Sequence, residues 1–307
     1  MVTFAYIHIV SNVRFDSIVT KSAVLASIVA SARRSGHIVM YMPDGDRLRK
    51  NGFFVTPNAL RDGIFDLQNL SQEACEQFLG SHESDLAGFE ADKTTLKKYF
   101  KDSQLKKVAN YSGEGISLVD LLKHAQEQKT HAPMCFSVVV DSLMSQDEKP
   151  FLMVMDEFNC YYDHGHYFHM AYDEEVRNSI PYEKINLFEH VLSAMALSPD
   201  TDSDEVTEPK VVKRGGIIVA VTESHAVRRK VTDGLVASAQ SQDSMHVIEV
   251  PRFSDIEADH ILANFEATGI GQLRLDRGDT IMDEQEVAYL KMISGCVGQQ
   301  LLDASIV

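Results

Sequence analysis

Apolar residues gather in short continuous runs near the start of the chain, and these runs predict a strand, a helix and a second strand. Residues 3–10 (TFAYIHIV) are apolar and β-branched, as in a buried strand. Residues 20–35 carry apolar positions on one helical face, and Gly36 follows as a typical helix C-cap. Residues 38–42 (IVMYM) form the next apolar run. This β–α–β order favours a parallel sheet.

Three later runs extend the predicted sheet, and a helical tail follows them. Residues 151–155 (FLMVM) are wholly apolar, which is typical of a central parallel strand covered on both faces. Residues 216–221 and 247–250 predict two further strands. After them, Ser254 and Glu257 have the spacing of a capping box at the start of a helix.

The segments between these runs set the predicted domain organisation. Residues 44–134 are polar and helix-leaning, with 117–126 as the clearest helix, and have too few periodic apolar positions for a core of their own. We interpret them as a helical insertion. The acidic stretch 199–213 contains two prolines and predicts a solvated linker. We therefore expect an α/β domain over 1–252 and a small helical lid over 253–307.

Charge and composition narrow the function classes. The chain has 29 basic and 45 acidic residues, a net charge of −16, which argues against gripping nucleic acid over a broad face. No apolar run reaches the roughly 18 residues that span a bilayer. Four separated cysteines without a C-x-x-C pair indicate reduced residues of a non-secreted protein. One basic patch either meets RNA or forms a surface of mixed charge: Lys97, Lys98, Lys101, Lys106 and Lys107, interleaved with Tyr99 and Phe100.

The most specific motif is FLMVMDE at residues 151–157, which matches the Walker B pattern of apolar residues followed by Asp-Glu. In that interpretation Asp156 holds Mg²⁺ and Glu157 orients the attacking water. The alternative is a buried strand that ends in solvated acids, but the β–α–β start favours Walker B. Thr222 follows the strand at 216–221, in the place of a sensor residue, although a polar residue there is common in any case.

The phosphate loop departs from its pattern, G-x-x-x-x-G-K-S/T. Lys21 and Ser22 fall at the correct place, at the start of the first predicted helix, but Phe15 and Thr20 occupy the two glycine positions. The alternative is a pair of exposed polar residues in a first helical turn. Together the patterns predict an α/β fold of the P-loop NTPase type (AAA+/ASCE-like): a parallel five-stranded sheet flanked by helices, with a small C-terminal helical lid. The loop predicts poor nucleotide binding and no useful hydrolysis.

Two other polar clusters have both a functional and a plain interpretation. A histidine group after the Walker B strand could bind a metal or form a polar loop, and a basic run could touch phosphate or RNA or be a solvated helix face. The two groups are His164, His166 and His169, and Arg228, Arg229 and Lys230.

Several segments resemble the death-associated protein 3 family, over about residues 20–305. They are GHIVMYMPDGDRLRKNG at 36–52, SGEGISLVDLLKHA at 112–125, FLMVMDEFNCYYDHGHYFHMAYDE at 151–174 and IEVPRFSDIEADHIL at 248–262. The most specific of them is the Walker B strand with its tail, in which an Asp is followed by an Asn and then by aromatics: Asp156, Asn159, Tyr161 and Tyr162.

The resemblance implies a structural component of the head of the mitochondrial small ribosomal subunit. It implies neighbouring mitochondrial ribosomal proteins as partners, ribosomal RNA at a minor contact, and GTP or GDP with Mg²⁺ held for a structural purpose. By position, Lys21 and Ser22 would contact the phosphate and Mg²⁺, and Asp156 would be the Walker B acid. The family carries a presequence and a long segment before the first strand, so we expect the natural N-terminus to lie further upstream.

Two other functions stay open at this point. The first is an AAA+-like ATPase that acts on nucleic acid or protein, which should keep its loop glycines and an arginine finger. The second is a signalling adaptor in cell death, which no feature of the sequence supports.

Overall fold

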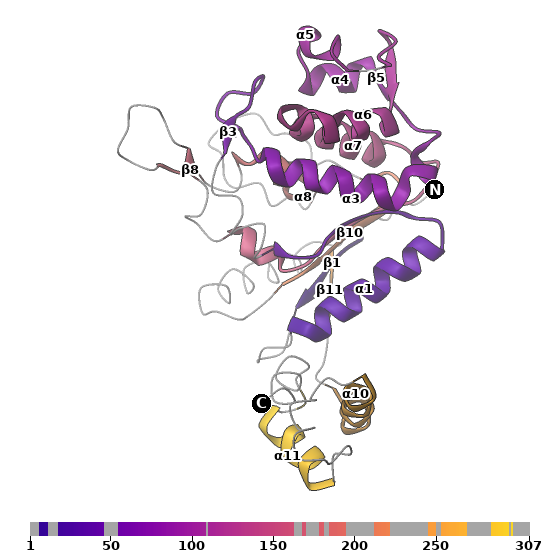
Figure 1. Ribbon diagram of the computed structural model, residues 1–307, viewed down its shortest axis with the longest axis vertical. Coiled ribbons are helices and arrows are strands. Elements are labelled where there is room, and N and C mark those ends of the chain that lie inside the picture. The colour runs from indigo at the N-terminus through magenta and orange to yellow at the C-terminus, as the bar shows by residue number, and fades with distance from the viewer. Residues whose placement is uncertain are drawn as a thin grey trace.

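A parallel β-sheet runs through the centre of the molecule, with helices on both of its faces (Figure 1). The computed structural model describes residues 6–11, 18–45, 55–108, 110–162, 168–169, 178–180, 184–194, 212–221, 245–249, 253–268, 284–294 and 296. The strands of the sheet are β1 (Tyr6–Ser11), β2 (Ile38–Met42), β7 (Phe151–Met155), β10 (Gly215–Ala220) and β11 (Met245–Glu249). They pair in the order β11-β1-β10-β7-β2, and each pair is parallel.

Strands β2, β7 and β10 are apolar on both faces because each face is covered. Alternate side chains point to opposite sides of a strand, so each strand feeds two separate clusters. One cluster contains Ile38, Met40, Met42, Phe151, Met153, Met155, Ile217 and Val219. The other contains Val39, Val154, Ile218 and Ala220. The prediction that 151–155 is a central strand covered on both faces is confirmed, since β7 lies between β10 and β2.

Helix α1 (Ile18–Arg34) covers the second of these faces, where Leu25 and Val29 are buried against the strands. The helix ends in a Schellman motif. The N–H of His37 donates to the carbonyl of Ala32 at 3.0 Å, and Gly36 adopts a φ of +79°, which glycine reaches without a steric cost. The predicted C-cap at Gly36 is therefore confirmed.

The predicted insertion supplies most of the layer on the other face. Its main helices are α3 (Gln68–Leu86) and α6 (Leu118–Glu127), and α7 (Ala132–Ser145) completes the layer. These helices share one apolar cluster with the sheet, so the insertion is far richer in core positions than the pattern suggested. Helix α6 is the helix expected at 117–126, and Ser117 caps it by accepting a hydrogen bond from the N–H of Val119 at 3.2 Å.

Shorter elements complete the described part of the chain. Helix α8 (Asn186–Ala194) packs against α7 and lies in the same layer. The remaining elements are β3 (Thr56–Pro57), β4 (Phe65–Asp66), β5 (Glu90–Asp92), α4 (Lys93–Tyr99), α5 (Asp102–Leu105), β6 (Gly115–Ser117), the 3₁₀ helices η1 (Lys129–His131) and η2 (Phe158–Tyr162), β8 (Phe168–His169), β9 (Asn178–Ser179) and α8 (Asn186–Ala194).

A buried polar network fastens α8 to this layer. The amide of Asn186, the first residue of α8, donates to Asp66 Oδ1 at 3.0 Å and accepts from the Ser137 hydroxyl at 3.0 Å. Arg61 donates to the same amide oxygen and pairs with Glu189. Burial raises the pKa of Asp66, and the donating amides oppose that shift. Buried polar groups of this kind are stable because each finds a partner.

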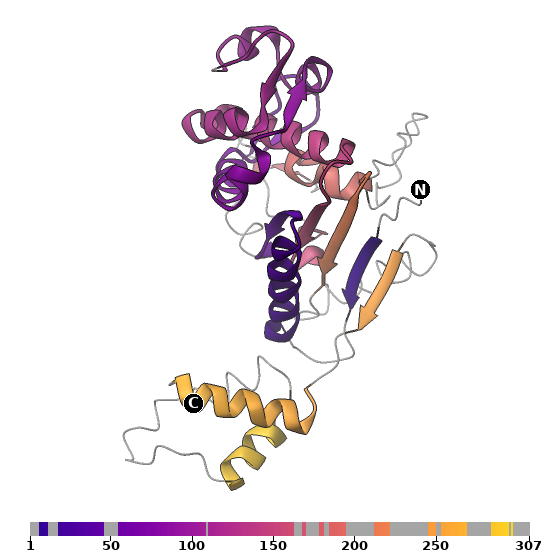
Figure 2. The same ribbon diagram turned by 90° about the vertical axis from the view of Figure 1, so that its right-hand side faces the viewer.

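Two C-terminal helices, α10 (Asp255–Thr268) and α11 (Glu284–Ser294), lie beyond the carboxyl ends of the strands (Figure 2). The predicted capping box is confirmed: the Ser254 N–H donates to Glu257 Oε2 at 2.8 Å, and the Glu257 N–H donates to Ser254 Oγ at 3.3 Å. Residues 199–211 of the predicted linker lie outside the described residues. The predicted linker extends too far at its C-terminal end, because Val212 is buried and the Lys213 N–H donates to the carbonyl of Met144 at 2.9 Å. Within the described ranges, no helix is long and apolar enough to cross a membrane.

A pair of buried histidines lies between α6 and η1. His124 Nε2 is 2.8 Å from His131 Nδ1, so one ring donates to the other. Burial lowers the pKa of both rings, and a charge on His124 would lower the pKa of His131 further. The pair is therefore held in its neutral form.

We expect this pair to make folding sensitive to acid. The folded-state pKa values lie below the unfolded value of about 6.5, so the stabilising contribution is complete above that pH and is lost as the pH falls below it. The free energy of unfolding in urea should fall more steeply between about pH 7.5 and about pH 5.5 in the natural chain than in the His124→Gln/His131→Gln variant. Parallel pH profiles for the two proteins would show that the pair does not titrate on unfolding.

Candidate nucleotide site

The candidate site lies where α1 begins, at the carboxyl end of β7. The alternation along β7 places Val154 on the α1 face, and Asp156, two residues later, falls on the same side. In the sheet β10 lies between β1 and β7, so the chain must cross one strand to bring α1 to this place. Helix α1 does so by packing over β10, β7 and β2.

The Asp156 carboxylate is held by two donors at this corner. The Ser22 hydroxyl donates to Oδ2, and the N–H of Glu157 donates to Oδ1 at 2.8 Å. The N–H of Asp156 donates to the carbonyl of Met42 at 2.9 Å, which continues the β2–β7 ladder by one bond. Asp156 is only 4% exposed. The buried carboxylate is thus fixed in position by both of its oxygens.

The structure brings together part of the predicted site. Ser22 and Asp156, 134 residues apart in sequence, are joined directly. Lys21 lies in α1 immediately before Ser22, and Thr20 is also helical. Glu157 adopts a φ of +51°, and its N–H donates to the carboxylate of the preceding residue. Phe15 and Thr222 lie outside the described residues.

Two residues of this corner were missed by the sequence analysis. Gly45 packs on the turn after β7: a Cβ at this position would lie 2.5 Å from the carbonyl oxygen of Glu157 and 2.9 Å from that of Asp156. The Tyr41 phenol lies on the same face, where burial raises its pKa and the charge of Asp156 raises it further. The alternation of side chains along β2 could have predicted that Tyr41 lies on the α1 side. Nothing in the sequence predicts the contact of Gly45 with the turn after β7.

The lysine patch forms a surface of mixed charge, and most residues of the histidine group and of the basic run lie outside the described residues. In the basic patch, Lys98 Nζ is 3.5 Å from Asp141 Oδ2 and Lys97 Nζ is 3.9 Å from Asp102 Oδ1, so the surface is mixed in charge. The aromatics between these lysines, Tyr99 and Phe100, are buried and do not offer their rings to RNA bases. His164, His166, Arg228, Arg229 and Lys230 lie outside the described residues.

In the part of the chain that the structure describes, no group of three or more His, Cys, Asp or Glu side chains could hold a metal ion. The hydroxyl and carboxylate oxygens of Ser22 and Asp156 are suitable Mg²⁺ ligands, but two are too few without phosphate oxygens and water. The first turn of α1 carries no acidic residue that would oppose an anion at this helix end. The corner therefore fits a magnesium–phosphate group better than a free metal ion.

A comparison with known protein families gives a match, whose range includes β7, Asp156 and the segment after them. The family model of mitochondrial ribosomal death-associated protein 3 matches residues 16–293. The chain belongs to this family. Family membership places it in the mitochondrion, as a ribosomal protein. Asn159 of the family-like tail is 1% exposed, within η2. No curated protein matches the chain.

The contact of Gly45 predicts a local loss of stability on substitution. In Gly45→Ala the added methyl meets main-chain oxygens that cannot move freely, so the free energy of unfolding should fall by about 1–3 kcal/mol. The matched control is Gly80→Ala, at an exposed position of α3 with open space around it. There the same change should raise stability by roughly 0.5–1 kcal/mol through helix propensity. Equal effects of the two substitutions in urea unfolding would contradict the close contact.

Proposed function

We propose that this member of the mitochondrial ribosomal death-associated protein 3 family is a structural constituent of the head of the small ribosomal subunit, with neighbouring ribosomal proteins as its main partners. The family match over most of the chain supports this role. The acidic balance of the chain agrees with contacts made mainly to proteins, because a net charge of −16 disfavours a broad contact with ribosomal RNA.

The second part of the proposal is that this corner is a structural nucleotide site and not a catalytic one. The observation that supports it is the hydrogen bond from the Ser22 hydroxyl to the Asp156 carboxylate. Ser22 and Asp156 would hold Mg²⁺ of a guanine nucleotide, and the start of α1, with Lys21, would face its phosphates. A bound Mg²⁺ would supply charge neutralisation for the phosphates. The chain's own residues fix the corner through the hydrogen bonds of Asp156 and through the close packing of Gly45.

We propose that the chain as written binds GTP or GDP weakly and does not hydrolyse GTP at a useful rate. A phosphate loop needs glycine where its backbone turns tightly around phosphate, and the sequence has no glycine before Gly36. An active AAA+-like ATPase would need an intact loop, and neither the family match nor the described residues favour that alternative. No observation supports a signalling adaptor.

Assembly into the ribosome tests the first part. We expect the chain, expressed at native level with a mitochondrial targeting sequence, to co-sediment with the small ribosomal subunit in a sucrose gradient. A carrier protein with the same targeting sequence should remain at the top of the gradient. Recovery of the chain only in ribosome-free fractions would overturn the proposed role.

Nucleotide titration tests the second part. We compare the binding of a fluorescent GDP analogue, with and without Mg²⁺, to the natural chain and to Phe15→Gly/Thr20→Gly. Binding of phosphate would require a tight loop at Phe15 and at Thr20, which is helical in the structure, at a cost of about 1–3 kcal/mol for each residue. Because about 1.4 kcal/mol is tenfold, binding is weakened by a factor of roughly thirty to twenty thousand, and the double variant should bind more tightly by that factor. Adding Ser22→Ala to the double variant should remove the Mg²⁺ dependence. Tight, Mg²⁺-dependent binding by the natural chain would refute the prediction.

A further inference from the structure

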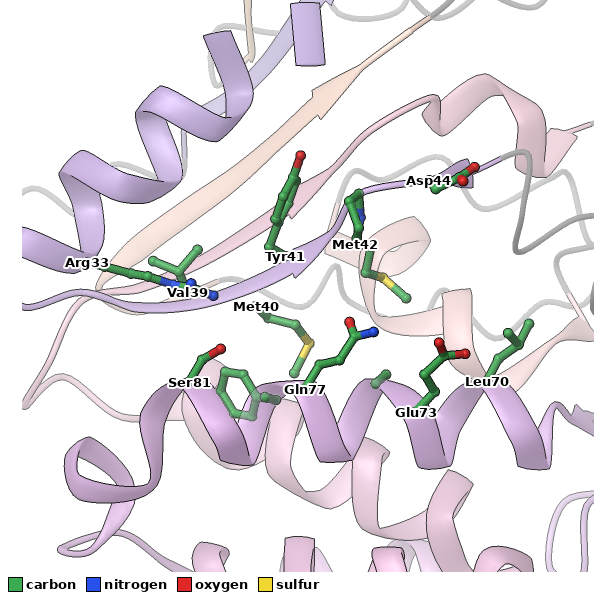
Figure 3. A pocket seen from close by; sticks show the side chains of 13 residues that line it. Arg33, Val39, Met40, Tyr41, Met42, Asp44, Leu70, Glu73, Gln77 and Ser81 are labelled. Atoms are coloured by element: carbon green, nitrogen blue, oxygen red, sulfur yellow. The ribbon is translucent and has the colours of Figure 1, made fainter. Parts of the chain in front are cut away.

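An apolar groove of about 400 Å³ runs between the edge strand β2 and helix α3 (Figure 3). We call it the β2–α3 groove. Strand β2 ends the sheet order, so one side of its main chain has no strand partner in the described sheet. The groove is a different surface from the Ser22–Asp156 corner. Its walls come from residues 39–44 of β2 and the following turn, from residues 70–81 of α3, and from Arg33 in the last turn of α1.

The register of β2 shows which main-chain groups face this groove. The N–H of Ile38 donates to the carbonyl of Pro150, and the carbonyl of Met42 accepts from the N–H of Asp156, both at 2.9 Å. Residues two apart in a strand point their main-chain groups the same way, and the residue between them points the opposite way. The N–H and C=O groups of Val39 and Tyr41 therefore point to the open edge.

One of these two residues is already capped by a side chain. His82 Nε2 lies 3.1 Å from both the N–H nitrogen and the carbonyl oxygen of Val39. His82 has non-helical dihedral angles at a kink of α3, and its Nδ1 is 3.2 Å from Asp85 Oδ2. Lys149 Nζ in turn lies 3.0 Å from Asp85 Oδ1, so the cap is fixed from behind. Among the described residues, none forms a hydrogen bond to the main chain of Tyr41.

The opposite wall of the groove offers apolar surface and one amide. Met40 points from β2 toward α3 (Figure 3), and Ala74 and Phe78 of α3 also line the groove. Gln77 directs its amide from α3 toward the strand (Figure 3). An amide can both donate to and accept from a peptide main chain. The groove thus offers hydrogen-bonding groups for a peptide on both walls, the main chain of Tyr41 on one and the side-chain amide of Gln77 on the other, with an apolar surface between them.

We propose that the β2–α3 groove binds an extended, basic and apolar segment of a neighbouring protein by adding it as a short strand beside β2. The segment pairs with the N–H and C=O of Tyr41 and places an apolar side chain between Met40 and Phe78. Gln77 contacts its main chain from α3. A basic segment is favoured because the chain carries a net charge of −16, and because the charged residues that line the groove are two acids, Asp44 and Glu73, at one end and a single arginine, Arg33, at the other. This binding does not depend on a nucleotide.

A synthetic peptide tests the pairing. The probe is a fluorescein-labelled heptapeptide of alternating lysine and valine, measured by fluorescence anisotropy on the whole chain. Strand pairing along a single edge uses every second amide of the peptide. N-methylation of one set of alternate amides should therefore weaken binding by about tenfold or more, while methylation of the other set leaves it within about twofold. The same peptide with glutamate in place of lysine should bind at least about tenfold more weakly.

Two variants of α3 test the place. Ala74→Phe fills the groove and should weaken binding of the peptide by about tenfold or more. Glu76→Phe places the same ring at an exposed position of α3 that does not line the groove, and should leave binding within about twofold. Thermal unfolding of both variants shows that they are folded. No saturable binding of the lysine–valine peptide, equal effects of the two methylation patterns, or equal effects of the two variants would each overturn the proposal.

Discussion

Burial of both faces of β2, β7 and β10 is the constraint on which the rest of the structure depends. Wholly apolar strands can be stable only between two covering layers, and the chain supplies those layers from different places. Helix α1 covers one face directly after the first strand, and α3, α6 and α7 cover the other. The insertion between β2 and β7 is therefore an integral half of the core and not an appendage to it.

The same alternation that fills the core also positions the polar corner. Since Val154 faces α1, the acid two positions later faces α1 as well, at the point where the strand ends and apolar contacts give way to hydrogen bonds. The corner is then held by contacts of the chain with itself: a hydroxyl on the carboxylate, a backbone N–H on its second oxygen, and Gly45 against two carbonyls. A corner fixed in this way keeps its shape through the chain's own contacts, which agrees with a role in an assembly.

Local patterns predicted the elements whose cause is local. The bounds of β2 and β7, the glycine cap of α1 and the capping box before α10 depend on a few neighbouring residues, and all were found. The number of core positions in the layer of α3, α6 and α7 was underestimated, because the apolar residues are spread over several elements and none of these has a strong periodic pattern by itself. Tyr99 and Phe100 illustrate this: between lysines they suggest an RNA surface, yet both are buried. In the site, Ser22 and Asp156 follow from motif positions. The approach of Gly45 to Glu157 depends on two turns 112 residues apart, and no local pattern contains it.

The cap of Val39 by His82 also bears on how the molecule behaves in a crowded compartment. An open edge strand is a template on which copies of a chain can stack into fibrils, and such stacking needs several consecutive residues to pair. Here the histidine closes the edge at one point, and Pro43, which lacks an N–H, follows the strand on the other side. Among the described residues of β2, only Tyr41 between these two points leaves its main chain open, which is too short a template for the growth of an aggregate. Mutual repulsion between chains that each carry a net charge of −16 acts in the same direction, since it opposes the association of one copy of the chain with another.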